Sequence, residues 1–294
     1  MELSRRVPPL PWQELLRRTL PVLARRPSAL ICDIDGVLSD IAPTPEAAFV
    51  APAAKAALRR LVTQLNLVAV VSGRSAPNAA SMVGVETIVV VGNHGMETIT
   101  ERGERREHPK AVGVETALTE SLREIQERLR GSIFQPSVLV EHKGLTATVH
   151  YRLAEDTEAA RAEILPIAVE AAQRRGLVVT EGRLIVELRP NIVVNKGTAI
   201  IDLVVQHRLR GVIFLGDDVT DVDGFVALRA LRDREEIDAI VVGVLGAETP
   251  AVVVEAMDVG VQGVAAVGLF LTALGDSLAA TAGETDDSQK ERVP

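Results

Sequence analysis

Short hydrophobic runs alternate along the chain with segments in which hydrophobic residues return every three or four positions. The runs are typical of buried strands and occur at Ala29–Cys32, Leu67–Val71, Thr87–Val91, Val212–Leu215 and Ala239–Val244. The spaced segments predict amphipathic helices over Ala53–Gln64, Ser75–Val83, Thr198–Arg208 and Val222–Arg232. Strands that alternate with helices indicate an α/β fold, with a doubly wound, Rossmann-like parallel sheet covered by helices on both faces.

The middle of the chain follows a different order. Helical spacing over Val114–Arg130 and over Glu155–Arg175 precedes, in each case, two strand-like segments joined by a turn that contains glycine. These predicted hairpins pair Ser137–Glu141 with Leu145–Arg152 and Leu177–Thr180 with Arg183–Leu188. The order αββαββ predicts an α+β domain inserted over residues 109–189, between core segments 28–108 and 190–276.

The two ends of the chain differ from the core. Leucines at helical spacing between Pro11 and Ala24 predict a lead-in helix within residues 1–27, whereas residues 277–294 lack apolar periodicity and are predicted to be disordered. Residues 1–20 have no continuous apolar core of a signal peptide. The most apolar stretch, Val259–Leu274, is shorter than the ~20 residues that span a membrane. We therefore expect a cytoplasmic protein without a membrane partner.

Composition and charge narrow the possible partners. Aromatic residues make up 2% of the 294 residues and hydrophobic residues 47%, so we expect a core of Val, Ile, Leu and Ala, which suits buried parallel strands. The net charge of −8 disfavours a nucleic-acid partner, although a local site could still bind an anionic substrate. The single cysteine, Cys32, cannot form an internal disulfide and is compatible with a reducing cytoplasm.

Two carboxylates follow the first predicted strand, in Asp33-Ile34-Asp35-Gly36. Residues two apart in an extended segment point the same way, so both carboxylates can face one spot at the sheet edge where open α/β sheets bind ligands. One could attack phosphorus while the other transfers protons. Calcium loops and acidic turns share this pattern, but Thr44 stands where an EF-hand loop has its last glutamate.

Three further motifs stand at predicted strand ends or helix starts. Ser72, in Ser72-Gly73-Arg74, could hold a phosphoryl oxygen or simply cap the next helix. Lys196 is at the start of a predicted helix, where the helix dipole disfavours a cation unless negative charge lies opposite. It could therefore face carboxylates and a phosphate, or it could be an ordinary exposed lysine. The carboxylates in Asp217-Asp218-Val219-Thr220-Asp221 follow a buried strand and favour a divalent cation, with an acidic helix-capping turn as the alternative.

In this order, the four motifs resemble those of the haloacid dehalogenase phosphatases. The resemblance implies the α/β core of that superfamily, with the inserted domain as its cap. It further implies that Asp33 is the nucleophile, that Asp35 is the general acid and base, and that Ser72 and Lys196 hold the phosphoryl group.

The same resemblance implies a Mg²⁺ cofactor. Its ligands would be Asp33, the carbonyl of Asp35 and Asp217, with Asp221 in support. The family usually has threonine after the glycine of the first motif, where this chain has Val37. We expect the replacement to be tolerated, because the threonine is not itself reactive.

Further segments are similar to the trehalose-6-phosphate phosphatase family within that superfamily, and the likeness extends from Ala29 to Leu274. In the core they are Ser72-Gly73-Arg74, Gly92-Asn93-His94-Gly95, Glu187-Leu188-Arg189-Pro190 before Lys196-Gly197, and Gly216-Asp217-Asp218 with Thr220-Asp221. In the inserted domain, Glu141-His142-Lys143 and His150-Tyr151-Arg152 look like that family's substrate-facing hairpin.

This closer resemblance implies hydrolysis of a sugar phosphate, trehalose 6-phosphate, to trehalose and phosphate as the last step of trehalose biosynthesis. Glu141 and Lys143 would contact the sugar, because charged side chains on a lid can read hydroxyl groups with directional hydrogen bonds. Arg74, Asn93 and His94 would also bind the substrate.

Other functions remain open at this point. A cap-bearing phosphatase for sucrose-6-phosphate, mannosyl-3-phosphoglycerate or glucosylglycerol phosphate would share the catalytic residues and differ in the lid, and a phosphomannomutase fits the motifs less well. A non-catalytic sugar-phosphate-binding relative would be expected to have lost Asp33, Asp35 or Asp217, all of which are present. The sequence shows no second catalytic domain, so a separate trehalose-6-phosphate synthase is a candidate partner.

Overall fold

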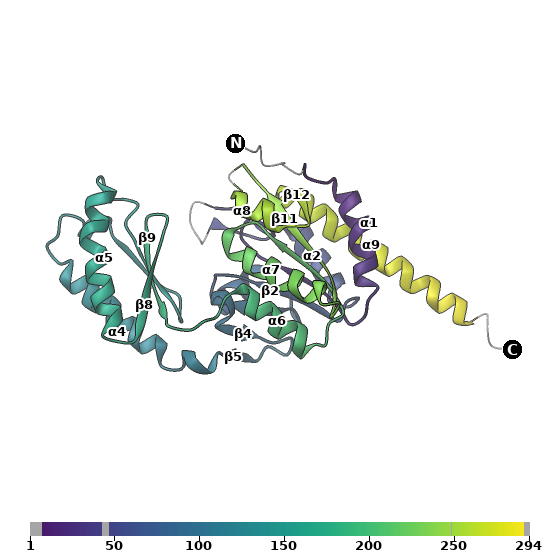
Figure 1. Ribbon diagram of the computed structural model, residues 1–294, viewed down its shortest axis with the longest axis horizontal. Helices are drawn as coiled ribbons and strands as arrows, with labels where there is room; N and C mark the ends of the chain where they lie inside the picture. The colour runs from purple at the N-terminus through teal and green to yellow at the C-terminus, as the bar shows by residue number, and fades with distance from the viewer. Residues whose placement is uncertain (1–7, 43–46, 248, 291–294) are drawn as a thin grey trace. The chain divides into compact units, whose positions relative to one another are not determined.

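The chain folds into two compact units. The computed structural model describes residues 8–42, 47–247 and 249–290. Unit 1 is formed by Met1–Arg106 and Val194–Pro294 as far as they are described, and unit 2 is formed by Glu107–Val193. Figure 1 labels the helices and strands of both units.

Unit 1 is built on a mainly parallel sheet. Within the described residues this sheet has eight strands, in the order β12-β11-β10-β1-β2-β3-β4-β5. Neighbouring strands from β12 to β3 are parallel, and β4 runs antiparallel to β3. The α/β core predicted from the sequence is therefore confirmed. The strands are β1 (Ser28–Cys32), β2 (Leu67–Val71), β3 (Val89–Gly92), β4 (Glu97–Ile99), β5 (Arg105–Glu107), β10 (Gly211–Gly216), β11 (Asp238–Leu245) and β12 (Val259–Gln262).

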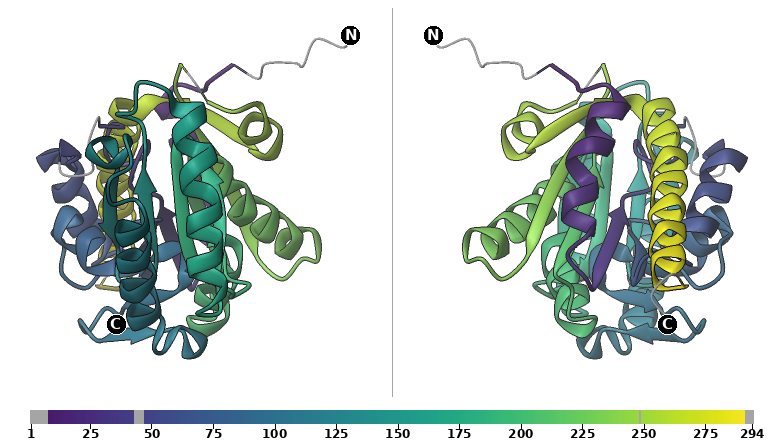
Figure 2. Two further views of the ribbon diagram at one scale, coloured as in Figure 1. Left: turned by 90° about the vertical axis from the view of Figure 1, so that its left-hand side faces the viewer. Right: turned by 90° about the vertical axis from the view of Figure 1, so that its right-hand side faces the viewer.

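Helices cover both faces of this sheet because its strands are apolar on both sides. All of β1 is buried; Leu30 and Cys32 join one hydrophobic cluster, while Ala29 and Ile31 join the other. The first cluster packs under α1 (Trp12–Leu23), α2 (Pro52–Leu61), α3 (Ala76–Val83) and α9 (Gly263–Lys290), and the second under α6 (Lys196–Gln206), α7 (Val219–Asp233) and α8 (Ala251–Ala256). Figure 2 shows α1 and α9 side by side.

The last helix corrects one expectation from the sequence. Residues from Ser277 to Lys290 continue α9, although the sequence predicts disorder there. Alanine is the strongest helix former, and Leu278 packs against the core, so the helix continues past the point where apolar periodicity ends. The segment Gly263–Thr281 also reaches the length and hydropathy of a membrane span.

One face of α9 nevertheless packs into the core of unit 1. Val267, Phe270, Leu271 and Leu274 are at most 1% exposed and lie in the cluster beneath α1 and α2. Their spacing is that of one helix face directed at a sheet. Length and composition alone therefore do not distinguish this helix, which packs on the core by one face, from a membrane span.

Unit 2 contains an antiparallel sheet backed by two helices. The elements follow the order α4 (Val114–Arg128), β6 (Leu139–His142), β7 (Ala147–His150), α5 (Thr157–Gln173), β8 (Leu177–Gly182) and β9 (Ile185–Pro190). Its described strands pair in the order β6-β7-β9-β8, and every pair is antiparallel. Val149, Val186 and Leu188 are fully buried at alternating positions, as expected for the sheet face covered by α4 and α5.

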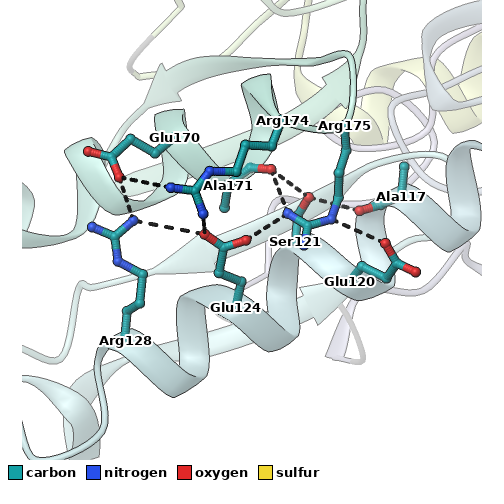
Figure 3. Close-up of polar contacts among 9 residues, drawn as sticks. All are labelled: Ala117, Glu120, Ser121, Glu124, Arg128, Glu170, Ala171, Arg174 and Arg175. Atoms are coloured by element: carbon teal, nitrogen blue, oxygen red, sulfur yellow. Dashed lines mark hydrogen bonds and ion pairs between the residues drawn. The ribbon is translucent and has the colours of Figure 1, made fainter.

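Charged side chains join α4 to α5 (Figure 3). Glu124 of α4 accepts hydrogen bonds of 2.8 Å from Arg174 and from Arg175, which follow α5. Arg128 of α4 donates to Glu170 of α5 at 2.7 Å. The hydrogen bond from Arg175, followed by the charges of the neighbouring guanidinium groups, holds the pKa of Glu124 below its ordinary value.

We expect Glu124→Gln to lower the midpoint of thermal unfolding near pH 7, because the variant loses the charge that the arginines bind. A carboxyl group with a lowered folded-state pKa stabilises the fold above its unfolded pKa of about 4, and this contribution is lost as the pH falls through the folded value. The difference between variant and wild type should therefore shrink as the pH falls below about 4, as measured by scanning calorimetry. Glu127→Gln, at an exposed position of the same helix, is the control; equal shifts for the two variants would contradict the prediction.

Candidate active site

Two carboxylates emerge together where β1 and β10 end. The strands are parallel neighbours in which Cys32 pairs with Leu215, and the Asp33 N–H donates to the Leu215 carbonyl at 2.9 Å. Asp33 and Asp217 therefore both leave the sheet at its carboxyl edge. Gly36 makes their approach possible, because it has φ +78° and a Cβ there would lie 1.9 Å from Asp217 Oδ2.

Lys196 is buried between two carboxylates. Its Nζ lies 2.9 Å from Asp33 Oδ2 and 2.7 Å from Asp221 Oδ1, and the residue is 2% exposed. The alternative of an exposed lysine is therefore wrong. Burial by itself would lower the pKa of Lys196, but the two carboxylates outweigh that effect and raise it above its ordinary value.

Asp221 braces the turn that carries Asp217. Its Oδ1 accepts from Lys196, and its Oδ2 accepts from the backbone N–H groups of Asp217 at 3.0 Å and Asp218 at 3.1 Å. Asp221 lies in the first turn of α7 and is fully buried. Both of its oxygens therefore accept hydrogen bonds from protein donors.

The remaining carboxylate oxygens could hold a metal ion. Asp33, Asp217 and Asp221 each offer an oxygen within 4.8 Å of the others. In the part of the chain that the structure describes, Asp33 Oδ1 and Asp217 Oδ1 are buried without a hydrogen-bond partner. Three carboxylates and the Lys196 ammonium leave two negative charges, which a divalent cation would neutralise.

The same excess of negative charge is visible in the pKa values. Burial, followed by the charges of Asp33 and Asp221, raises the pKa of Asp217 to about 8. Burial also raises the pKa of Asp33 above its ordinary value, although Lys196 opposes the change. Both carboxyl groups therefore resist ionisation unless positive charge is added beside them.

Asp35 and Ser72 both contact Arg74. Arg74 donates from Nε and Nη2 to the two oxygens of Asp35, each at 2.7 Å, and from Nη1 to Asn78 at 3.1 Å. The Ser72 hydroxyl accepts the Arg74 N–H at 3.3 Å and is buried. The ion pair joins the loop after β1 to the loop after β2, a contact that the sequence did not predict.

Asn93 and His94 form a left-handed turn after β3. Their φ angles are 48° and 58°, which are uncommon outside glycine. Asn93 is buried and donates from Nδ2 to Glu97 at 2.6 Å, while the His94 ring lies where a Cβ on Gly73 would be. Glu97 was not among the site residues predicted from the sequence. The one sequence signal for it is a carboxylate at the start of a strand whose other residues are apolar or small.

Glu141 and Lys143 lie together on unit 2. Glu141 Oε2 is 3.7 Å from Lys143 Nζ and 3.1 Å from His150 Nε2. Glu141 pairs with Thr148 across β6 and β7, so His150, two residues along β7, projects from the same sheet face. This face is opposite to the one that holds Val149.

A cavity of about 660 Å³ opens in unit 1 beside the carboxylates. Asp33, Asp35 and Asp217 line it on their side. The remaining lining is largely apolar and includes Ile41, Val244, Leu245, Pro250 and Val264, none of which was predicted from the sequence. The cavity can therefore admit a ligand to the carboxylates of unit 1.

Solved structures share this fold. The C-terminal domain of a Candida albicans trehalose-6-phosphate phosphatase matches with a TM-score of 0.70 at 20% identity, covering 92% of this chain and 98% of that one. A trehalose-6-phosphate phosphatase related protein gives a TM-score of 0.67 at 23% identity, covering 86% and 99%. At these identities the two matches establish the fold that this chain shares with them.

Sequence comparison identifies the family. Residues 31–251 match the model of the trehalose-phosphatase family. A trehalose-phosphate phosphatase of Mycobacterium marinum is 36% identical over 238 residues, which are 77% of this chain and 60% of the relative. One of Mycobacterium tuberculosis (strain H37Rv) is 33% identical over 252 residues, which are 81% and 62%. The chain therefore belongs to the trehalose-phosphatase family and spans about 60% of the length of these relatives. The resemblance noted in its motifs is confirmed.

We expect the protein stripped of divalent ions to become less stable as the pH rises from about 4 to about 8. An acid whose folded-state pKa is raised above its unfolded value costs stability across that interval, and the pKa of Asp217 is raised to about 8. Scanning calorimetry in chelator should show the falling midpoint, and Asp217→Asn should remove much of the slope. Asp218→Asn, the same charge change at the exposed neighbour, should keep most of it; equal slopes in the two variants would refute this reading.

Proposed function

We propose that the chain is a Mg²⁺-dependent phosphatase that hydrolyses trehalose 6-phosphate to trehalose and phosphate. The observation that carries the proposal is the buried cluster in which Lys196 pairs with Asp33 and Asp221, while Asp33 Oδ1 and Asp217 Oδ1 accept no hydrogen bond from any described residue. The names of the Mycobacterium relatives support the choice of substrate.

The carboxylate of Asp33 attacks phosphorus in this proposal. The bond from phosphorus to the sugar oxygen breaks, Asp35 gives that oxygen a proton, and an aspartyl-phosphate forms on Asp33. Asp35 then takes a proton from water as the water oxygen attacks phosphorus, which releases phosphate and restores Asp33. Lys196 and Ser72 hold the phosphoryl oxygens. Mg²⁺, held by Asp33, the Asp35 carbonyl and Asp217, would neutralise the charge that develops on the phosphoryl group.

Arg74 holds the side chain of Asp35 in place before a ligand arrives. Its guanidinium donates one hydrogen bond of 2.7 Å to each carboxylate oxygen, a geometry that fixes the orientation of the carboxylate. We infer that the arriving substrate competes for Arg74, which loosens its hold on Asp35. Arg74 thereby keeps its predicted contact with the substrate. The contacts predicted for Asn93 and His94 are more indirect, because Asn93 already donates to Glu97.

The inserted residues 109–189 act as the cap in this proposal, and residues 28–108 and 190–276 form the catalytic core. Glu141 and Lys143 read the sugar hydroxyls with charge-assisted hydrogen bonds. His150, which lies 3.1 Å from Glu141, holds that carboxylate in place. A phosphatase for another sugar phosphate would share Asp33, Asp35 and Lys196 and would differ in these cap contacts.

The proposed setting is the cytoplasm, where a separate trehalose-6-phosphate synthase would supply the substrate. An acidic protein with one buried cysteine suits a reducing compartment. The proposal needs no nucleic-acid or membrane partner.

The decisive test is phosphate release from a panel of sugar phosphates, with and without Mg²⁺. We expect Mg²⁺-dependent release that is fastest on trehalose 6-phosphate. Asp33→Asn should lower it by a factor of about a thousand or more, because the nucleophile is lost. Asp202→Asn, an exposed aspartate of α6, is the matched control. Preference for another sugar phosphate would overturn the substrate, and no release by folded protein would overturn the enzyme.

The sugar contacts have a separate test. We expect Glu141→Gln to raise KM for trehalose 6-phosphate by about tenfold or more, since a hydrogen bond from a charged group is lost. Hydrolysis of p-nitrophenyl phosphate, which has no sugar, should be unaffected. Glu155→Gln, at an exposed position of the same unit, serves as the control. A parallel loss on both substrates would place Glu141 in the chemistry or the fold instead of in sugar recognition.

A further inference from the structure

Glu97 is a buried carboxylate outside the four catalytic motifs. It is the first residue of β4, its side chain is 0% exposed, and both of its oxygens accept from donors of described residues. Its Oε1 accepts the Ala76 N–H at 2.9 Å and the Asn93 Nδ2 at 2.6 Å, and its Oε2 accepts the Arg105 Nε at 3.0 Å. A carboxylate can accept hydrogen bonds at both of its oxygens, so the side chain of Glu97 can satisfy all three of these donors.

The two groups bound by Oε1 begin two different elements. Ala76 is the first residue of α3, and the N-cap residue Ser75 makes no side-chain capping bond. Glu97, which lies on β4, therefore supplies an acceptor for a backbone N–H at the start of this helix. Asn93 begins the left-handed turn after β3, and its side chain is held by the same oxygen. Gly92 lets the two elements approach, because a Cβ there would lie 2.2 Å from the Ala76 nitrogen.

The loop of Ser72 and Arg74 lies between these two elements. The His94 N–H donates to the Ser72 carbonyl at 3.0 Å, and the Asn93 N–H donates to the Arg74 carbonyl at 2.8 Å. The far end of the loop enters α3 at Ala76. Glu97 thus binds one group on each side of the loop, and its carboxylate sets the distance between them.

We propose that Glu97 is a positioning residue that holds Ser72 and Arg74 in place to receive a phosphoryl group. The inference rests on the proposed function, because it concerns the loop that would bind the phosphate. Glu97 does not line the cavity beside the carboxylates and acts only through the loop. Arg105, whose side chain is 47% exposed, neutralises it from the other side.

The amide variant Glu97→Gln tests the proposal with little change of shape. It replaces one acceptor oxygen by an NH₂ group, which must face either Ala76 and Asn93 or Arg105, all of them donors. We expect kcat to fall by about ten- to a hundredfold, as for a displacement of about 1 Å in a catalytic group. Inorganic phosphate should bind more weakly in a ³¹P NMR titration, while half-saturation by Mg²⁺ stays unchanged.

A second variant separates positioning from loss of the fold. In Glu97→Gln combined with Arg105→Ala, the NH₂ group can turn toward the side that Arg105 vacates, and Oε1 keeps its two bonds. We expect this double variant to regain most of the kcat and phosphate affinity that the single variant loses. Glu104→Gln, on the same segment and 52% exposed, is the matched control with wild-type values.

Three results would overturn the proposal. They are wild-type kcat and phosphate affinity in folded Glu97→Gln, a loss that only follows the folded fraction in thermal unfolding, and a double variant no better than the single one. If the wild type released no phosphate from any sugar phosphate, the proposed function would fail instead. The phosphate titration would still test Glu97 in that case, since it does not depend on turnover.

Discussion

Lys196 is the positive charge on which the carboxylate edge of unit 1 depends. Asp33 and Asp221 are buried on either side of it, and removing one member of a buried ion pair costs about 3–5 kcal/mol because an unpaired charge remains. Asp221 in turn holds the backbone that presents Asp217. One ammonium group thereby fixes Asp33, the proposed nucleophile, and the turn that carries Asp217, and the carboxylate oxygens without a hydrogen-bond partner could hold a cation.

The sheet is what makes such a concentration of charge possible. Apolar strands covered on both faces place their polar residues only where they end, and parallel strands end at one edge. The close approach there needs residues without side chains: a Cβ at Gly36 would meet Asp217, and one at Gly216 would lie 2.4 Å from the Cβ of Asp221. The glycines of these motifs are thus as necessary to the site as its carboxylates.

Around this centre, two carboxylates have opposite tasks. Asp35 is partly exposed and paired with Arg74, so its partner can be exchanged when a ligand arrives. Glu97 is fully enclosed by donors, so its contacts cannot be exchanged without leaving a buried group unpaired. An exchangeable ion pair beside a fixed carboxylate suits the proposed function, in which Asp35 transfers protons while the loop of Ser72 and Arg74 keeps its position.

The sequence by itself determined the alternation of strands and helices, the parallel core and the four motifs at its edge, because strand and helix periodicity and strand-end chemistry depend on neighbouring residues. Only the tertiary structure decided which side chains meet. Arg74 and Asp35 are 39 residues apart, and Glu97 and Ala76 are 21 apart, so their pairing depends on how loops from different strands fold over one edge. The apolar wall of the cavity and the length of α9 could not be predicted from neighbouring residues either, because both depend on packing against the core.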